Sequence, residues 1–234
     1  MRASTVSHSS QNVFFVIPAY NEAGMVQRVV RELRQSHPHV VVVDDGSSDE
    51  TAVEARRGGA TVVRHLVNRG QGAALQTGIE YALRSGADVI VTFDADGQHR
   101  PEDADALLEA LETSSADVAL GSRFLGGARS NIPPIRRITL RLAALFMRAS
   151  TGVALTDAHN GLRALRRRAA EKIHLTLDGM AHASELIDHL RRHSLKITEV
   201  PVQIRYSEYS LRKGQSSTAA FRIAFDYLLK RWFR

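Results

Sequence analysis

The chain has 234 residues, of which 44% are hydrophobic, and it contains no cysteine. This length and composition predict one globular domain or two small ones. Without cysteine there are no disulfides, thiolate nucleophiles or zinc–cysteine sites, so any catalysis depends on Asp, Glu, His, Arg or a bound metal.

The formal net charge of +6 is the average of two unlike halves. Residues 1–120 contain 10 Arg and no Lys against 17 Asp and Glu, a net charge of −7. Residues 121–234 contain 21 Lys and Arg against 8 Asp and Glu, a net charge of +13. This division predicts different roles for the two halves.

No segment has the pattern of a membrane span, because charges interrupt every apolar run well short of the roughly 18 to 20 residues required. The N-terminal segment Met1–Asn12 is polar and lacks the apolar stretch of a signal peptide. We expect a cytoplasmic protein that meets a membrane only at its surface.

The first half predicts strands that alternate with helices. Strands are expected at 13–20, 40–43, 61–64, 89–93 and 117–120, and helices at 22–35, after the capping residues 47–50, at 72–84 and at 101–112. Short Val/Ile-rich strands separated by helices predict an α/β fold with a mainly parallel sheet covered on both faces. Ligands of such sheets bind at the carboxyl ends of the strands.

The second half is less regular. We expect a loop at 121–134, helices at 135–149 and 181–193, a strand at 196–205 with edge character from Val200-Pro201-Val202, and a closing amphipathic helix at 217–234. There is no internal repeat and no low-complexity linker, so residues 1–234 are predicted to form a single domain.

The sharpest local signal is Asp94-Ala95-Asp96-Gly97-Gln98-His99, where an apolar strand gives way to a loop. Two carboxylates and an amide oxygen at this spacing could converge on one Mg²⁺ or Mn²⁺ and leave positions open for substrate phosphates. A solvated acidic turn is the alternative.

Two further clusters follow strands. Asp44-Asp45-Gly46 could be a helix-capping turn or could bind a base or ribose. Residues 68–72, Asn-Arg-Gly-Gln-Gly, could be a phosphate-facing loop before a helix N-terminus.

Taken together, VIPAYNE, VVVDDGSSDET, NRGQGAALQTGI, DADGQHRPED and GSRF resemble glycosyltransferase family 2, which has the GT-A fold. Further along, TDAHNGLRALRR, MAHASELIDHL, the run Glu199-Val200-Pro201-Val202 and RKGQSS are similar to the branch that includes dolichyl-phosphate mannose synthase and bacterial polyprenyl-phosphate glycosyltransferases. The resemblance implies a nucleotide-sugar-binding half at 1–120, an acceptor-side half at 121–216 and a terminal helix at 217–234.

The resemblance also implies roles for individual residues. The nucleotide-sugar donor would meet Pro18, Tyr20, Glu22, Asp45, Asp94, Ala95 and Asp96, and later Arg212, Lys213 and Ser216 in a basic loop over the diphosphate. Asp94, Asp96 and Gln98 would bind Mg²⁺ or Mn²⁺. Arg123 would lie beside the transferred sugar and the phosphates, and it is a catalytic candidate together with Asp96. A cation and basic groups would stabilise the charge that gathers on the leaving diphosphate.

The helix expected at 181–193 bears on whether the acceptor is a hydroxyl or a phosphate. A hydroxyl acceptor needs a general base, commonly from a Glu-Asp pair in this family, but here Leu186 follows Glu185. A phosphate acceptor needs no base. We therefore expect a polyprenyl phosphate as the sugar acceptor, and the family resemblance implies that the transfer is inverting. A saccharide hydroxyl, with Glu185 or Asp188 as base, is the second reading.

Basic residues could bind the acceptor phosphate. Arg136, Arg137 and Arg141 could form a pocket with Arg123, or they could be a solvated basic face. Asp157 could orient an acceptor or the sugar, and Arg163 could bind phosphate or pair with an acid; a buried structural Asp–Arg pair is the alternative.

The expected helix at 217–234 combines aromatic and basic residues, as interfacial helices do. It could lie on the inner face of the cell membrane, meet a separate membrane protein, pack on the core or form a homodimer. A non-catalytic module that binds nucleotide or anionic lipid is a further alternative. Nucleic acid is not expected, because the basic residues are not interleaved with aromatics.

Overall fold

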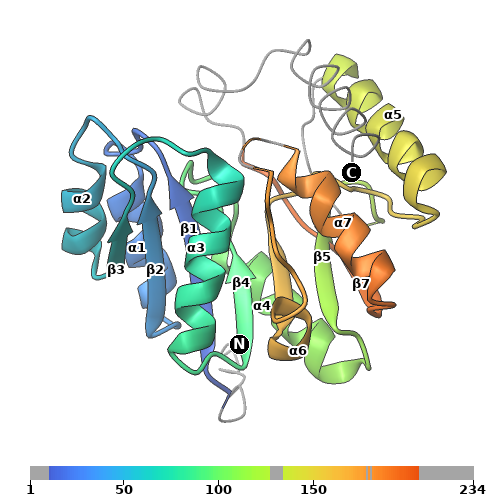
Figure 1. Ribbon diagram of the computed structural model, residues 1–234, viewed down its shortest axis with the longest axis horizontal. Helices are drawn as coiled ribbons and strands as arrows, with labels where there is room; N and C mark the ends of the chain where they lie inside the picture. Colours follow the sequence, from blue (N-terminus) through green and yellow to red (C-terminus); the bar gives the residue numbers. More distant parts are fainter. Residues whose placement is uncertain (1–10, 127–133, 178, 180, 206–234) are drawn as a thin grey trace, which may run out of the picture.

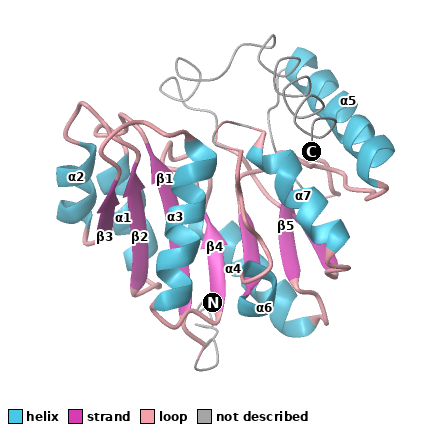
Figure 2. Cartoon of the chain, viewed as in Figure 1, coloured by secondary structure: helices cyan, strands magenta, loops and turns pink. Residues whose placement is uncertain are grey.

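The computed structural model describes residues 11–126, 134–177, 179 and 181–205. They form a seven-stranded sheet with helices packed on both faces (Figure 1, Figure 2). The expected helix at 217–234 and the loop with Arg212, Lys213 and Ser216 lie outside the described residues. Within the described ranges, no helix is long and apolar enough to cross a membrane.

The strands lie in the order β3-β2-β1-β4-β6-β5-β7. They are β1 (Val13–Ala19), β2 (His39–Asp44), β3 (Thr61–Arg64), β4 (Val89–Thr92), β5 (Val118–Ser122), β6 (Arg163–Arg166) and β7 (Ile197–Pro201). Strand β6 runs antiparallel to both of its neighbours, β4 and β5, whereas the other pairs are parallel. The sheet is therefore mainly parallel, as the sequence predicts.

Seven helices are described: α1 (Val26–Arg34), α2 (Thr51–Gly58), α3 (Gln71–Arg84), α4 (Pro101–Thr113), α5 (Pro134–Thr151), α6 (Arg167–Ala170) and α7 (His182–Arg192). Helices α1 and α4 contribute to the hydrophobic cluster on one face of the sheet, and α3, α6 and α7 contribute to the cluster on the other. Helix α5 lies at the end of the molecule towards which β1 and β2 run (Figure 1).

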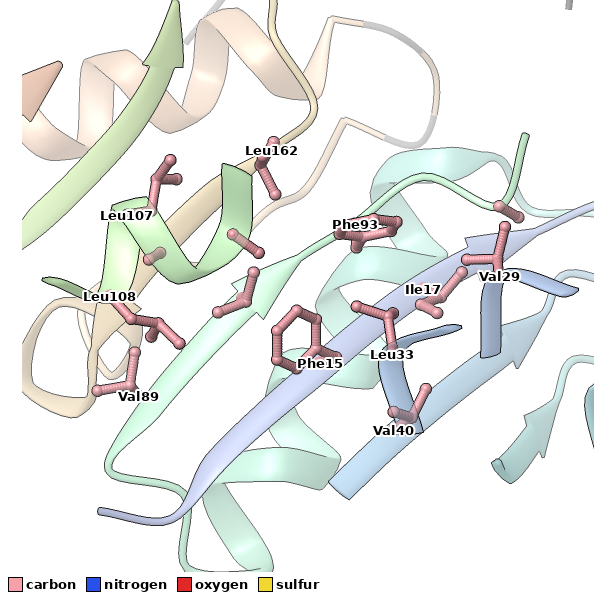
Figure 3. Close-up of a cluster of buried hydrophobic side chains, with 14 of the residues drawn as sticks. Phe15, Ile17, Val29, Leu33, Val40, Val89, Phe93, Leu107, Leu108 and Leu162 are labelled. Atoms are coloured by element: carbon pink, nitrogen blue, oxygen red, sulfur yellow. The ribbon is translucent and has the colours of Figure 1, made fainter. Parts of the chain in front are cut away.

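Alternation along β1 explains why its sequence is continuously apolar. Phe15 and Ile17 point into the cluster that contains Leu33 of α1 (Figure 3). Phe14 and Val16, one residue out of phase, point into the cluster on the opposite face. A strand buried on both faces has no solvent-facing position where a polar residue is favoured.

The structure corrects the sequence prediction in the second half. Residues 163–166 form β6, a strand that the sequence analysis missed because Arg occupies two of its four positions. The expected strand at 196–205 is shorter, Ile197–Pro201, and lies at the sheet edge as predicted. Arg166 is accommodated because its guanidinium donates hydrogen bonds to the carbonyl oxygens of Leu111 and Ala116.

Candidate active site

A cavity of about 610 Å³ opens at the carboxyl ends of β1, β2 and β4. Its lining residues come from strand ends and the loops that follow them: Pro18, Ala19, Tyr20, Glu22, Asp45, Asn68, Gly70, Gln71, Ala74, Asp94, Ala95, Asp96, Gln98, His99, Arg123, His159, Asn160, Gly161, Gly179 and Ile204. The predicted donor residues at 18, 20, 22, 45 and 94–96 are all among them. The structure therefore brings together the strand-end motifs that the sequence singles out.

The turn after β1 is fixed against the turn after β2. The backbone N–H of Asn21 donates to Ser47 Oγ at 2.9 Å, and that of Glu22 donates to Thr51 Oγ1 at 2.7 Å. Asn21 adopts a left-handed conformation with φ of 54°, which Asn tolerates better than most residues. These contacts place Glu22 and the half-exposed Tyr20 on the cavity wall.

Asp45 holds the loop that follows β3. Its carboxylate accepts hydrogen bonds from the backbone N–H groups of Arg69 at 2.9 Å and Gly70 at 2.7 Å. His65 Nδ1 lies 2.7 Å from the same carboxylate, and His65 Nε2 lies 2.9 Å from Thr77 Oγ1. Asp45 lines the cavity and also orders the loop, a second role that the sequence analysis did not identify.

The carboxylate of Asp94 is held by one contact to each of its oxygens. His99 Nε2 lies 2.9 Å from Asp94 Oδ2, and Gln71 Nε2 donates to Oδ1 at 3.4 Å. Burial alone would raise the pKa of Asp94, but the hydrogen bond from His99 and the positive charge of Arg163 hold that pKa below its usual value. Asp94 is therefore ionised.

Asp96 has the opposite shift. Burial and the adjacent negative charge of Asp94 raise the pKa of Asp96 to about 6, and Glu22 adds to the effect; the N–H of Gln98, which donates to Asp96 at 3.0 Å, opposes it. Two carboxylates that repel each other in a cavity are a site where a cation is favourable.

The oxygen donors of Asp94, Asp96 and Gln98 fit a hard divalent cation that keeps open positions for phosphate oxygens. In the described part of the chain, no group of three or more His, Cys, Asp or Glu side chains is arranged to hold a metal ion. The fit therefore rests on two carboxylates and one amide, with the remaining ligands left to the substrate.

Arg123, in the loop after β5, lines the same cavity as these carboxylates, and Asp157 fixes its guanidinium. Arg123 Nε and Nη2 donate to the two carboxylate oxygens of Asp157 at 2.6 and 2.8 Å, and the Arg123 N–H adds a third bond at 3.2 Å. Burial would raise the pKa of Asp157, but the Arg123 guanidinium lowers it. The two oxygens and two N–H groups make a bidentate pair with one fixed geometry.

Glu199 on β7 in turn holds Asp157. The sequence analysis did not identify this contact. The Glu199 carboxylate accepts hydrogen bonds from Thr156 N at 2.9 and 3.0 Å, from Thr156 Oγ1 at 2.8 Å and from Asp157 N at 3.2 Å. A chain of contacts thus runs from the edge strand to Arg123. The sequence analysis used the run Glu199-Val200-Pro201-Val202 to predict an edge strand and as part of the family resemblance, but this run does not predict the contact with Asp157.

Arg163 of β6 is buried, with 3% of its surface exposed. Burial lowers the pKa of its guanidinium, and the nearby charges of Asp94 and Asp157 raise it. Arg163 is not among the residues that line the cavity. It acts on the site through its positive charge, which lowers the pKa of Asp94. The alternative of an Asp157–Arg163 pair gives way to the observed Asp157–Arg123 pair.

Glu185 lies elsewhere. Its carboxylate accepts hydrogen bonds from Thr176 N and Leu177 N, both at 2.9 Å, and from Thr176 Oγ1 at 2.6 Å. It is not part of the cavity lining. The structure thus uses this carboxylate to anchor the segment before α7.

Of the predicted acceptor-phosphate arginines on α5, Arg137 and Arg141 are not in the cavity lining either. Arg137 and Arg141 are exposed, and the guanidinium of Arg141 lies 5.7 Å from the ring centroid of Phe124, next to Arg123. Arg136 belongs to α5, but its side chain lies outside what the structure describes. Of the three, Arg141 has a described contact beside the site.

A mostly parallel sheet with a polar cavity at the carboxyl ends of its strands defines an α/β protein whose ligand site lies at those strand ends. The model of the family described as glycosyl transferase family 2 matches residues 14–174. The chain belongs to this family, and it is a glycosyltransferase. The family resemblance and the α/β class expected from the sequence are confirmed.

Relatives match along nearly the whole chain. A UDP-N-acetylglucosamine–dolichyl-phosphate N-acetylglucosaminyltransferase of Methanococcus voltae is 30% identical over 93% of this chain and 95% of its own. A polyprenol monophosphomannose synthase of Mycolicibacterium smegmatis is 33% identical over 92% of this chain and 86% of its own.

The fold also has solved neighbours. Glucosyl-3-phosphoglycerate synthase of Mycobacterium tuberculosis, crystallised with Mn²⁺ and UDP-glucose, is 19% identical and superposes with a TM-score of 0.73 over 95% of this chain and 79% of its own. This likeness shows that the GT-A fold is shared.

Proposed function

We propose that the protein transfers a sugar, with inversion and with the help of a divalent metal, from a nucleotide-sugar to a polyprenyl phosphate at the cytoplasmic face of the cell membrane. The observation that carries this proposal is the cavity, which is lined by the carboxylates of Glu22, Asp94 and Asp96 together with the guanidinium of Arg123. The names of relatives that match over more than nine-tenths of this chain supply the acceptor class.

The donor would lie along the strand ends. Its nucleoside would occupy the part of the cavity between Pro18–Tyr20 and the loop that Asp45 holds at Arg69 and Gly70. Asp94, Asp96 and Gln98 would hold Mg²⁺ or Mn²⁺ against the diphosphate. Bound there, the cation would act as a Lewis acid that neutralises charge on the leaving group.

The reaction would then be one displacement. An oxygen of the acceptor phosphate attacks the anomeric carbon from the face opposite the nucleoside diphosphate, the carbon–oxygen bond to the diphosphate breaks, and the configuration inverts. Arg123, fixed by Asp157, is the side chain placed to stabilise the developing negative charge. Groups that need no reorganisation during the reaction stabilise a transition state best.

The engagement of Glu185 favours a phosphate acceptor over a hydroxyl. A base for a hydroxyl must reach the proton that it removes. Three hydrogen bonds commit Glu185 to residues 176 and 177, and Asp188 is paired with Arg191 at 3.4 Å and Arg192 at 2.7 Å. A phosphate is already ionised at neutral pH and requires neither residue.

The direct test supplies a nucleotide-sugar labelled in the sugar, together with a short-chain polyprenyl phosphate and Mn²⁺, and measures label in the organic phase. We expect organic-phase product that is lost on chelation of the metal and in Asp96→Asn. Label that enters only water-soluble saccharide would overturn the acceptor assignment. Binding of anionic lipid without any turnover would favour the non-catalytic alternative.

The donor base is tested by heating the protein with UDP or GDP in the presence of Mn²⁺. A ligand that binds only the folded state raises the unfolding temperature. We expect one of the two nucleoside diphosphates to raise it more than the other, and the Asp96→Asn variant to lose the metal-dependent part of the shift.

A further inference from the structure

The loop of residues 65–70 lies between β3 and α3 and forms part of the cavity wall through Asn68 and Gly70. It packs directly against the turn after β2. A Cβ at Gly46 would lie 2.5 Å from the carbonyl carbon of Val67, so the two backbones are in close contact. The loop therefore cannot yield in that direction when a ligand enters the cavity.

His65, the first residue of this loop, links Asp45 to α3. Its Nδ1 lies 2.7 Å from Asp45 Oδ1, and its Nε2 lies 2.9 Å from Thr77 Oγ1. The side chains of His65 and Asp45 are 8% and 4% exposed, so water competes little for these contacts. An imidazole that donates at Nδ1 can accept a hydrogen bond from the Thr77 hydroxyl at Nε2, which satisfies both ring nitrogens.

The contacts of Asp45 leave its carboxylate little capacity for a ligand. Oδ1 meets His65 Nδ1 at 2.7 Å and the Arg69 N–H at 2.9 Å, and Oδ2 accepts the Gly70 N–H at 2.7 Å. A carboxylate has about four acceptor positions, so the described residues leave one of them, on Oδ2. Because Asp45 lines the cavity, this position is the one that it can offer to a bound nucleoside.

From this count we propose that His65 is a positioning residue for recognition of the nucleotide-sugar: it fixes the Asp45 carboxylate so that a single acceptor position remains for the base. A single acceptor matches the uracil of a nucleoside, which presents one N–H. Guanine presents a ring N–H and an amine side by side, and one of them would stay unpaired at Asp45, which weakens binding. The substrate class is therefore a uridine diphosphate sugar. This inference rests on the proposed function in one respect, namely that the cavity binds a nucleotide-sugar.

The test is calorimetric binding of UDP, GDP and pyrophosphate to the full chain in the presence of Mn²⁺. Pyrophosphate has no nucleoside, so it reports on the metal end of the cavity alone. The unaltered chain should bind UDP at least about tenfold more tightly than GDP. The variant His65→Leu should bind UDP about tenfold more weakly, because a hydrogen bond to a charged group is lost, and should bind pyrophosphate as before.

Three further variants control this result. His65→Asn keeps an N–H donor near the position of Nδ1 and should restore most of the affinity for UDP. Thr77→Val removes only the outer hydrogen bond of the ring and should weaken UDP by a smaller factor, so it tests the proposal even if circular dichroism shows that His65→Leu does not fold. His193→Leu changes an exposed histidine at the end of α7 and should bind UDP as the unaltered chain does.

Unchanged UDP binding by the folded His65 and Thr77 variants would overturn the positioning role, as would equal weakening of UDP and pyrophosphate. Binding of GDP as tightly as UDP by the unaltered chain would overturn the assignment of a single acceptor position. Sugar transfer to a polyprenyl phosphate is measured separately. Selective UDP binding without transfer contradicts the proposed function and leaves this inference standing, so the two failures are distinguished.

Discussion

At the scale of single residues, the geometry of Arg123 is set by a residue that never reaches the cavity. Glu199 fixes Thr156 and Asp157, and Asp157 fixes Arg123 through two side-chain hydrogen bonds. We expect Glu199→Gln to lower kcat about 10- to 100-fold, because a small misplacement of a charge-stabilising group has effects of this order. KM for the donor should change little, since the strand-end residues are not affected.

Steady-state kinetics with both substrates measures this split between kcat and KM. Glu171→Gln is the matched control, because Glu171 is half-exposed and pairs with Arg167 at the surface. Equal losses in the two variants, or a donor KM that rises as much as kcat falls, would contradict a positioning role for Glu199.

Gly161 protects the position of Asp94. A Cβ at residue 161 would lie 2.3 Å from Asp94 Oδ2, which no real contact allows, so Gly161→Ala must displace the carboxylate. We expect the metal-dependent rise in unfolding temperature with a nucleoside diphosphate to disappear. Gly126→Ala, whose Cβ would meet no atom within 4 Å, should keep the full shift.

The residues that the sequence identified and those that it missed differ in a physical way. Asp94, Asp96 and Arg123 follow strands directly, so the rule that ligands bind at strand ends finds them. Glu199 and His65 act through contacts with residues 20 to 43 positions away in the chain. No local spacing encodes such a contact, because it exists only once the strands have been brought into register.

At the scale of elements, α3 packs against β1 with no spare room. A Cβ at Gly78 would lie 2.2 Å from Val16 Cγ1. Overpacking of this kind costs about 1–3 kcal/mol, and the better helix propensity of Ala returns about 1 kcal/mol. We expect Gly78→Ala to lower the free energy of unfolding by up to about 2 kcal/mol in urea denaturation.

The same change should be less costly when the main obstacle is removed. In a Val16→Ala background the 2.2 Å contact is lost, and the nearest atoms to the new Cβ are Val43 Cγ2 at 3.2 Å and the Cβ of residue 16 at 3.3 Å, so Gly78→Ala should lower the free energy of unfolding by less than it does in the unaltered chain. The double-mutant cycle isolates this contact because the two residues touch directly. Additive effects of the two substitutions would show that α3 shifts away from β1 instead.

The strands with apolar runs could be predicted from the sequence, whereas β6, in which Arg and apolar residues are mixed, could not. The strands β1, β2 and β4 each contain a continuous run of apolar residues, since both faces of the sheet are covered. Strand β6 buries Arg163 and bonds Arg166 to backbone carbonyls, so its sequence has no strand pattern. Tertiary partners, not local propensity, make it a strand.

At the scale of the whole molecule, the two unlike halves of the sequence meet in the cavity. The net charge of −7 over residues 1–120 includes Glu22, Asp94 and Asp96, and the net charge of +13 over residues 121–234 includes Arg123 and Arg163. Arg163 acts on Asp94 from behind, and burial keeps the field between them strong. Among the residues that line the cavity, the carboxylates all come from the first half and the guanidinium, that of Arg123, comes from the second.

This assembly also buries two histidines, and their titration predicts how stability depends on pH. Burial lowers the pKa of both His159 and His182 from 6.5 to about 4. The unfolded chain therefore binds protons at these sites more readily, and the free energy of unfolding falls as pH drops from about 6.5 towards 4, by up to about 3 kcal/mol for each residue. Asp96, whose pKa is raised to about 6, opposes this because its protonation stabilises the folded state. The two histidines outweigh the one carboxylate, so the net change on acidification is a loss of stability.

Urea denaturation at a series of pH values, with the metal chelated, should show this loss in the unaltered chain and a shallower loss in His182→Gln. A free energy of unfolding that stays constant or rises on acidification would contradict the buried, neutral state of these rings.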